Sequence, residues 1–250
     1  MFKKLFFVAL ATFALAQGAK AQTNLQVFYD FGKDRGIITS TLEGFYGDKW
    51  GNTFFFIDHD FVPGETSING TYLEIARCFN FWQDSALGGL SIHAEYNGGV
   101  YSRYGIDHAA LFGLDYFFHS KDYKNTLNLK VLYKWIDYTA QPLGFKSNVP
   151  MQLTAVWGLQ DLFGLKGLRF SGFADFWWQD HLLFYDAQGF DMLPETSHVV
   201  FISEPQLWYN VGQHFGVPNL NVGGEVELSY DFGSSKGFWV RPCLGVKWVF

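Results

Sequence analysis

A phenylalanine-rich stretch that ends in acidic residues is the part of the sequence best suited to binding chemistry. It reads Thr53-Phe-Phe-Phe-Ile-Asp-His-Asp60. Side chains alternate between two faces of an extended strand, so the rings of Phe54 and Phe56 share a face with both acids. Aromatic rings stack on flat groups while carboxylates accept hydrogen bonds, which suits a flat polar solute such as a nucleobase or a sugar. A one-residue bulge would instead turn both rings to the opposite face, and the sequence leaves both alternatives open.

Charged residues recur at alternate positions, which places them on one common face of the predicted strands. That face carries more acids than bases. The acids are Glu43, Asp58, Asp60, Glu74, Glu95, Asp115, Asp175, Glu204, Glu225 and Glu227, and the bases are Lys130, Lys134, Arg169, Arg241 and Lys247. The candidate binding site combines two aromatic residues with most of these charged residues and one further arginine. Its members are Phe54, Phe56, Asp58, Glu43, Glu74, Arg77, Glu95, Asp115, Lys130, Lys134, Arg169, Asp175, Glu204, Glu225 and Arg241.

Patterns for catalysis and metal binding are weaker. Two histidines have serine neighbours: His93 lies near Ser91 and Glu95, and His198 lies near Ser197 and Ser203. Residues two apart on a strand are separated by about 6–7 Å, too far for a direct hydrogen bond unless the side chains are long. The sequence contains no G-x-S-x-G, H-E-x-x-H or C-x-x-C pattern. We therefore expect no enzyme activity, no metal and no cofactor.

The elements that position these residues are predicted to be β-strands. In the stretch 124–136, Leu127, Leu129, Val131, Tyr133 and Trp135 alternate with mostly polar residues, and Leu132 and Ile136 are exceptions. A helical period fits none of the four clearest stretches. The same pattern predicts twelve strands, near 23–31, 36–46, 53–61, 69–82, 89–98, 106–118, 124–137, 151–161, 167–178, 197–210, 219–231 and 237–250.

The lengths of these strands favour a single transmembrane antiparallel β-barrel. Ordinary globular strands have a mode of about 5–6 residues, whereas a tilted membrane-spanning strand needs about 9–11. An even strand number puts both termini on one side, which would be the periplasm. The longest predicted connections, 138–150 and 179–196, then fall on the outer side, as in outer-membrane barrels.

The composition agrees with a barrel whose two faces differ. Aromatic residues make up 20% of the chain and charged residues 17%, while the mean hydropathy is zero. This composition excludes a disordered chain and a disulfide-dense scaffold. We expect aromatic residues near strand ends to form girdles at the membrane interfaces. They are Tyr46, Trp50, Trp82, Trp157, Trp177, Trp178, Trp208, Tyr209 and Trp248.

The N-terminus predicts secretion. Lys3 and Lys4 precede an apolar run over 5–16, and Ala19-Lys-Ala21 forms a small-residue cleavage pattern. The expected division is a signal peptide over 1–21 and an outer-membrane barrel over 22–250. The mature chain would carry 15 basic and 24 acidic residues, a balance that argues against a nucleic-acid partner. Cys78 and Cys243 could pair in an oxidising compartment, but we favour two unpaired strand residues.

Several stretches give the chain a family resemblance. Leu42-Glu43, the Trp50 turn and the Phe-rich strand to Asp58 resemble early strands of the nucleoside-specific channel-forming outer-membrane proteins, the Tsx-like family. Tyr72-Leu-Glu-Ile-Ala-Arg-Cys-Phe79 resembles the family's Glu-Ile-x-Pro-Arg-Phe stretch, and Phe173-Ala-Asp-Phe-Trp177 its Phe-x-Asn-Phe-Asp-Trp stretch. The chain is also similar to short Bacteroidetes relatives of unknown function.

The resemblance implies a twelve-stranded channel for nucleosides, with two departures. Arg77 is three residues from Glu74 and so lies on the opposite face of a regular strand, whereas the family's spacing is four. Asp175 stands where the family has Asn. We expect a passive channel for small polar solutes in the outer membrane of a Gram-negative bacterium, favoured as a monomer, with lipid and lipopolysaccharide around it. The alternatives are a structural or hydrolytic barrel without transport, and a soluble periplasmic barrel.

Overall fold

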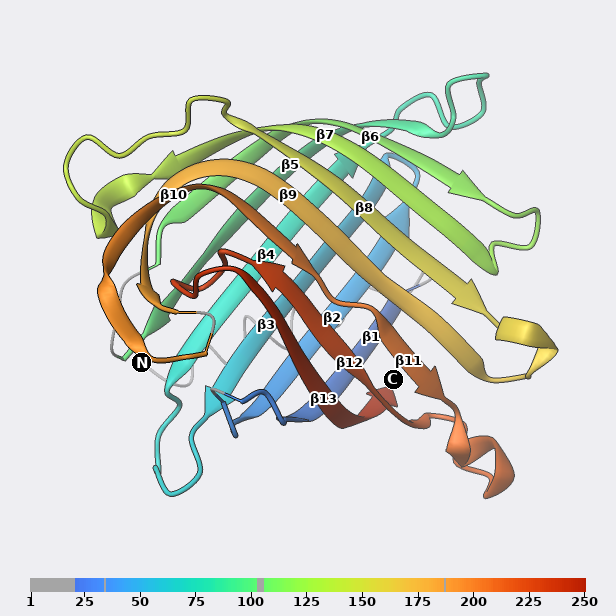
Figure 1. The fold of residues 1–250 in the computed structure, drawn as a ribbon. Helices are drawn as coiled ribbons and strands as arrows, with labels where there is room; N and C mark the ends of the chain where they lie inside the picture. The colour runs from blue at the N-terminus through green and yellow to red at the C-terminus, as the bar shows by residue number, and fades with distance from the viewer. Residues whose placement is uncertain (1–20, 34, 103–105, 187) are drawn as a thin grey trace, which may run out of the picture.

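The fold consists almost entirely of antiparallel strands (Figure 1). The computed structural model describes residues 21–33, 35–102, 106–186 and 188–250, so the predicted signal peptide lies almost wholly outside the described residues. The strands are β1 (Ala21–Asp30), β2 (Ile38–Asp48), β3 (Gly51–Phe61), β4 (Gly70–Phe79), β5 (Leu90–Tyr101), β6 (His108–His119), β7 (Asn125–Asp137), β8 (Met151–Gln160), β9 (Leu168–Tyr185), β10 (Asp191–Ser203), β11 (Gln206–Tyr209), β12 (Leu220–Tyr230) and β13 (Phe238–Val249). Three short 3₁₀ turns, η1 (Tyr138–Ala140), η2 (Leu162–Gly164) and η3 (Val211–His214), connect some of them.

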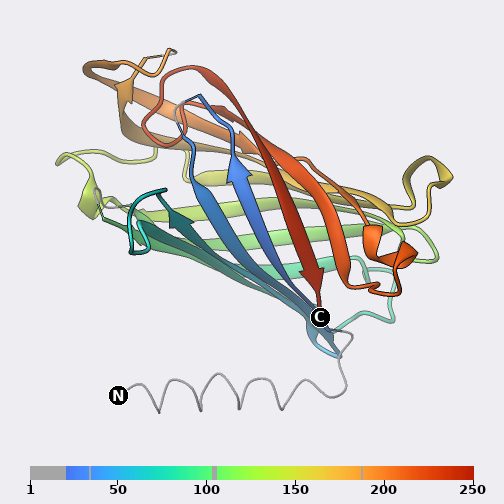
Figure 2. The same ribbon diagram turned by 90° about the horizontal axis from the view of Figure 1, so that it is seen from below.

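The strands form one closed twelve-stranded antiparallel barrel, as predicted. Each strand from β1 to β9 pairs with the next, and β1 pairs with β13 to close the ring. The segments β10 and β11 together count as one strand of the barrel, because both lie between β9 and β12. Pro205 lies between them and interrupts this strand, since proline has no backbone N–H to donate. Figure 2 shows the strands running side by side around the barrel.

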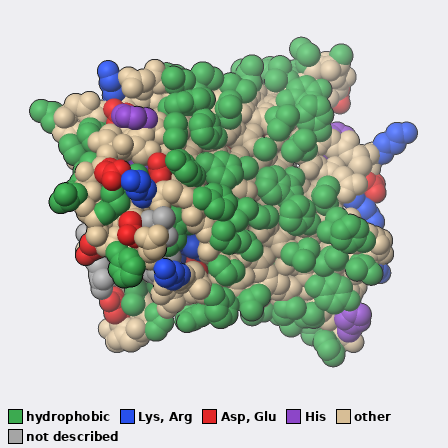
Figure 3. All heavy atoms as spheres, in the orientation of Figure 1, with side chains coloured by type: hydrophobic (Ala, Val, Ile, Leu, Met, Phe, Trp, Pro, Cys, Tyr) green, Lys and Arg blue, Asp and Glu red, His purple; other side chains and the backbone are tan. Residues whose placement is uncertain are grey.

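The two faces of the sheet differ as the alternation predicted. In β7, Leu127, Leu129, Val131, Tyr133 and Trp135 point outward and are 37–53% exposed. On the side of the barrel seen in Figure 3, apolar side chains cover most of the middle, and charged side chains gather towards the two ends. Soluble monomeric proteins rarely expose an apolar surface of this extent. Among the described residues, no helix is long and apolar enough to cross a membrane.

The exceptions to the alternation form an apolar cluster inside the barrel. Leu132 is fully buried and Ile136 nearly so. They pack with inward-facing residues from β6, β9 and β10, and the cluster consists of Ala109, Leu111, Leu132, Ile136, Trp177, Val200 and Ile202. Apolar and polar side chains therefore alternate on this part of the inner wall, where Lys134 lies between Leu132 and Ile136 on β7.

The two ends of the barrel differ less in loop length than the sequence predicted. The first and last described residues lie at one end, here called the terminal end, where the N–H of Phe250 donates to the carbonyl of Thr23 at 2.9 Å. The connection 138–150 is at the opposite end, but the turns 80–89 and 210–219 at the terminal end are also long. Most of the predicted loop 179–196 is in fact a hairpin that continues β9 and β10.

Packing explains why that predicted loop is strand. The side chains of His181 and Leu183 are buried. The imidazole of His181 hydrogen-bonds through Nε2 to the carbonyl of Asp231 at 2.6 Å, and the N–H of Phe184 donates to the carbonyl of Ser234 at 2.8 Å. The extended hairpin is therefore held against the 231–237 turn, a contact that strand periodicity alone does not reveal.

The predicted aromatic girdles are wrong at two positions. Trp177 and Trp208 are buried and face the interior, where the ammonium groups of Lys134 and Lys247 lie over their rings at 3.8 and 4.3 Å. Both occupy inward strand positions, since Trp177 is two residues from Asp175 and Trp208 is paired with Arg169, and each indole face attracts the cation above it. Trp248 is 40% exposed on the outer face, as a girdle residue should be.

We expect Gly51→Ala to destabilise the barrel by at least about 1–3 kcal/mol, because the residue has a left-handed backbone conformation (φ +135°) and a Cβ would lie 1.9 Å from the carbonyl oxygen of Cys78. Gly47→Ala in the same hairpin is the matched control, since no atom lies within 4 Å of a Cβ there. Urea unfolding in detergent micelles measures both. Equal unfolding midpoints would contradict this account of the turn.

Candidate functional site

The inner face of the barrel carries nearly all of the predicted site residues. The register of β2, β3 and β4 is continuous through the Phe-rich stretch, with Phe56 opposite Glu43 on one side and Glu74 on the other. The bulge alternative is therefore wrong, and the rings face inward. The inward set comprises Phe54, Phe56, Glu43, Asp58, Glu74, Glu95, Asp115, Lys130, Lys134, Arg169, Asp175, Glu204, Glu225 and Arg241.

Arg77 does not belong to this inward set. It lies on the outer face near the terminal end, where its guanidinium donates to Asp48 at 2.8 Å and to Thr53 at 3.1 Å. Its partner in the register is Thr53, one position away from Phe54. The spacing of three residues between Glu74 and Arg77 predicted this outer position. The inclusion of Arg77 in the candidate site was therefore wrong.

Aromatic rings and carboxyl groups lie together on the inner side of β2, β3 and β4. The ring centroids of Phe56 and Tyr72 are 5.9 Å apart. The hydroxyl of Tyr72 donates to Glu74 at 2.8 Å, and the hydroxyl of Thr41 donates to Asp58 at 2.5 Å. This aromatic–acid wall presents ring faces next to hydrogen-bond acceptors, which can stack on and orient a flat solute.

A second group of polar residues lies on β7, β8 and β9. The ammonium of Lys134 donates to Gln152 at 2.7 Å, and the hydroxyl of Thr154 donates to Asp175 at 2.5 Å. Lys134 also contacts the ring of Trp177. The inner face of β7, β8 and β9 therefore presents a cation, whereas the aromatic–acid wall presents acceptors. The lining as a whole can contact both acceptor and donor groups of a solute.

A buried ion-pair cluster connects β1, β12 and β13. The guanidinium of Arg241 donates to Glu227 at 2.5 Å, and that of Arg35 donates to Glu227 at 2.7 Å and to Asp30 at 3.1 Å. The side chains of Arg241, Glu227 and Asp30 are almost fully buried. Asp30 and Arg35 were not predicted from the sequence. Arg35 lies in the turn between β1 and β2, where no alternation of side chains indicates which face it is on.

The cysteines are unpaired, as favoured from the sequence. Both face inward, on β4 and β13, strands that are separated by β1, β2 and β3. Cys78 lies instead against His93 and Asp115 on the neighbouring strands β5 and β6. This cluster was not predicted from the sequence, although Cys78, His93 and Asp115 all occupy inward positions on successive strands, which could have indicated it.

The two serine–histidine groupings are not hydrogen-bonded pairs. The ring of His198 hydrogen-bonds to Asp180, while the hydroxyl of Ser197 donates to Asp231 and that of Ser203 to the carbonyl of Phe173. The ring of His93 contacts Glu95 through Nε2 at 2.8 Å. The bonded partners of these groups are therefore other residues than the serine and histidine of a nucleophilic pair.

A closed twelve-stranded barrel with an apolar outer face and a charged inner face places the chain in the class of transmembrane-type β-barrels. Residues 21–250 match the model of the family described as "Domain of unknown function (DUF5020)", and the chain belongs to that family. No curated protein matches the sequence.

Of three solved structures that are similar to the chain, one, a porin, has a TM-score above 0.5. The NanC porin is 10% identical, with a TM-score of 0.53 over 90% of this chain and 98% of that chain. The Acinetobacter baumannii outer membrane protein Omp33 is 10% identical, with a TM-score of 0.39 over 93% of this chain and 98% of that chain. Pseudomonas aeruginosa OccK2, solved in complex with glucuronate, is 13% identical, with a TM-score of 0.38 over 94% and 98%. At these identities the likeness to NanC extends to the fold alone.

Proposed function

We propose that the protein is an outer-membrane channel that passes small polar solutes passively. The observation that carries this proposal is the closed barrel with apolar side chains outside and charged side chains inside. The outer face fits a lipid surround, and the charged lining fits a wetted passage. In this proposal both termini face the periplasm, residues 1–21 are removed on export, and the barrel acts as a monomer surrounded by lipid and lipopolysaccharide.

Nucleosides are the proposed solutes. The aromatic–acid wall supports this, because Phe56 and Tyr72 can stack on a base while Glu74 and Asp58 accept hydrogen bonds from a base or a ribose. The resemblance to the Tsx-like family points to the same solutes. Asp175 differs from that family's Asn and adds an acid to the lining.

Liposome swelling tests the proposal directly. Vesicles containing the purified barrel are diluted into iso-osmotic nucleosides, sugars of similar size and amino acids, with protein-free vesicles as the control. Faster swelling with nucleosides than with sugars of equal size supports the nucleoside proposal. Swelling without that preference leaves only a general channel, and impermeability to every solute contradicts transport.

A closed structural barrel is the second candidate, and two observations favour it. The ion-pair cluster of Asp30, Arg35, Glu227 and Arg241 lies inside the barrel wall, and the apolar cluster around Leu132 fills another sector. Small barrels are commonly filled by their own side chains. Heat-modifiable gel mobility and membrane fractionation, without permeability, would support this candidate, whereas a soluble and unshifted band would indicate a soluble barrel.

We expect Asp58→Ala and Glu74→Ala to change nucleoside permeability several-fold, because each removes a hydrogen-bond acceptor from the aromatic–acid wall. The outward-facing Leu129→Ala is the matched control and should affect mainly stability. Swelling rates are compared at equal amounts of folded protein. Unchanged rates in both acid variants would remove these residues from the site.

A further inference from the structure

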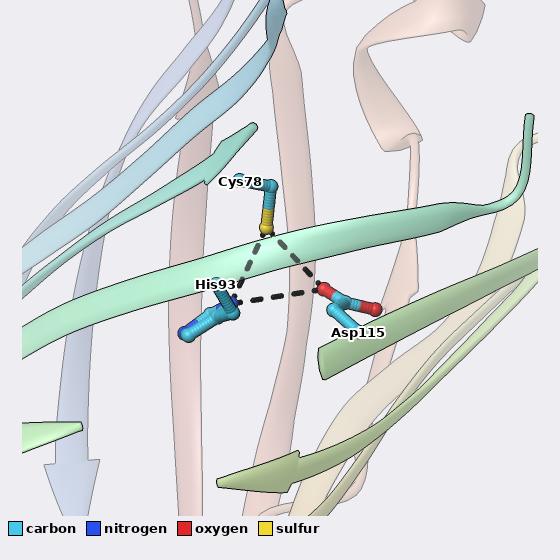
Figure 4. Close-up of side chains that lie close together, drawn as sticks. All are labelled: Cys78, His93 and Asp115. Carbon is cyan, nitrogen blue, oxygen red and sulfur yellow. Dashed lines mark hydrogen bonds and ion pairs between the residues drawn. The ribbon is translucent and has the colours of Figure 1, made fainter. Parts of the chain in front are cut away.

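Three side chains that can ligate a metal ion converge on the inner wall. In the pairing of β4 with β5, Cys78 is directly opposite His93. In the pairing of β5 with β6, Asp115 is opposite Ser91, two residues from His93 and on the same face. Figure 4 shows the three side chains pointing toward one another, and their ligating atoms all lie within 4.8 Å of one another.

The distances between these atoms match those of a tetrahedral zinc site. Cys78 Sγ lies 3.3 Å from His93 Nδ1 and 3.4 Å from Asp115 Oδ2, and Nδ1 lies 3.8 Å from Oδ2. Zinc bonds of about 2.3 Å to sulfur and about 2.0–2.2 Å to nitrogen and oxygen give tetrahedral edges of about 3.5–3.7 Å to sulfur and about 3.3–3.5 Å between nitrogen and oxygen. Side-chain shifts of a few tenths of an ångström would therefore place all three ligands.

Two further residues already orient the ligands. His93 Nε2 is 2.8 Å from Glu95 Oε2, and Asn128 Nδ2 donates to Asp115 Oδ1 at 2.7 Å. A proton on Nε2 shared with Glu95 leaves the lone pair of Nδ1 aimed at the thiol, which is the arrangement of a carboxylate–histidine–metal group. The amide of Asn128 likewise holds Asp115 with its other oxygen turned toward Cys78.

In this tautomer of His93, the cluster has one proton to donate and two acceptors within reach of it. The thiol of Cys78 has one proton, but both Nδ1 of His93 and Oδ2 of Asp115 lie within reach as acceptors. Only one of the two can accept it at a time. A cation between the three atoms would satisfy all of them, with the thiol as thiolate.

We propose that Cys78, His93 and Asp115 bind one Zn²⁺ ion on the inner wall of the barrel. Three protein ligands leave a fourth position for water or a solute group. The mixed set of thiolate, imidazole and carboxylate suits zinc, whereas magnesium and calcium prefer oxygen ligands alone. The proposal is independent of transport, because metal binding is measured on the folded barrel without a permeability assay.

The test uses the full barrel in detergent after removal of metal with a chelator. Zn²⁺ is titrated in competition with a chromophoric chelator, and Co²⁺ is added separately to record its absorption spectrum. We expect one equivalent of either metal, with a sulfur-to-cobalt charge-transfer band and the visible bands of a tetrahedral site. Glu95→Gln should weaken Zn²⁺ binding about 10–100-fold, and Cys78→Ser should weaken it further and abolish the charge-transfer band.

Cys243→Ser is the matched control, since Cys243 is also a buried, inward and unpaired cysteine. It should bind both metals as the parent does, and heat-modifiable mobility shows that each variant is folded. The proposal is overturned if no saturable Zn²⁺ site is found, if Ca²⁺ competes equally, or if Cys243→Ser loses the cobalt band as Cys78→Ser does. In the metal-free alternative the polar contacts of His93 are those with Glu95, Cys78 and Asp115, and no cobalt band appears in any variant.

Discussion

Glu227→Ala is expected to destabilise the barrel by about 3–5 kcal/mol, the usual cost of removing one partner of a buried ion pair. The variant removes the carboxylate that accepts from both Arg241 and Arg35, at 2.5 and 2.7 Å. The Arg241 side chain is only 2% exposed, so its charge would lose a close partner where water cannot easily replace it. Removing one member of a buried ion pair is costly for this reason, even where the pair itself adds little net stability.

An exposed ion pair of the same barrel provides the control. Lys236 donates to Glu195 at 2.7 Å, but both side chains are about half exposed, so Lys236→Ala should change stability little. Urea unfolding in micelles, followed by tryptophan fluorescence and gel mobility, compares the two variants. If Glu227→Ala unfolds at the same urea concentration as Lys236→Ala, the buried cluster contributes nothing to the fold.

The second large effect is expected in ion selectivity. The inner face carries ten of the predicted acids against five bases, so open channels in planar bilayers should favour cations over anions. Glu204, Glu225 and Asp58 lie close enough to interact electrostatically. An inner face with this excess of acidic residues concentrates cations and repels anions. We expect a reversal potential of cation-selective sign under a salt gradient at neutral pH and above.

Replacing some of the acidic residues on the inner face by neutral ones should reduce the selectivity for cations over anions. The double change Glu204→Gln and Glu225→Gln keeps the shape of both side chains and removes two ionisable carboxyl groups from the interior. Glu195→Gln removes one exposed charge from the hairpin outside the barrel wall and should leave the reversal potential unchanged. Anion-selective currents in the parent protein would contradict the proposed role of the acids, whereas absence of current would contradict the channel itself.

The strands and the faces of their residues were predictable because a strand has a period of two and a membrane barrel has opposite polarities on its two sides. Leu129 and Lys130 illustrate this, since adjacent positions in β7 face outward and inward as their chemistry requires. The common face of Phe56 and Asp58 was one of two alternatives that the alternation left open, and the register of β3 with β2 and β4 excludes the bulge.

Contacts between strands far apart in sequence were not predictable in this way. Arg35 and Glu227 are separated by 192 positions and meet because the ring closes. Trp208 was assigned outward as an interfacial aromatic, but a large ring also fits beside an inward lysine, and hydrophobicity does not distinguish the two positions. The extension of β9 depends on its contact with the 231–237 turn, which periodicity does not encode.

The pairing of β1 with β13 has a consequence for how the protein is made. Its register joins Asn24 to Val249 and Asp30 to Cys243, the first and last strands of the chain. These hydrogen bonds cannot form until β13 has been synthesised, and they join residues more than 200 positions apart, such as Asn24 and Val249, which makes such contacts slow to form. Until then the chain would have two unpaired strand edges, and such edges are prone to aggregate. We expect the nascent chain to need a holding chaperone on its way to the membrane.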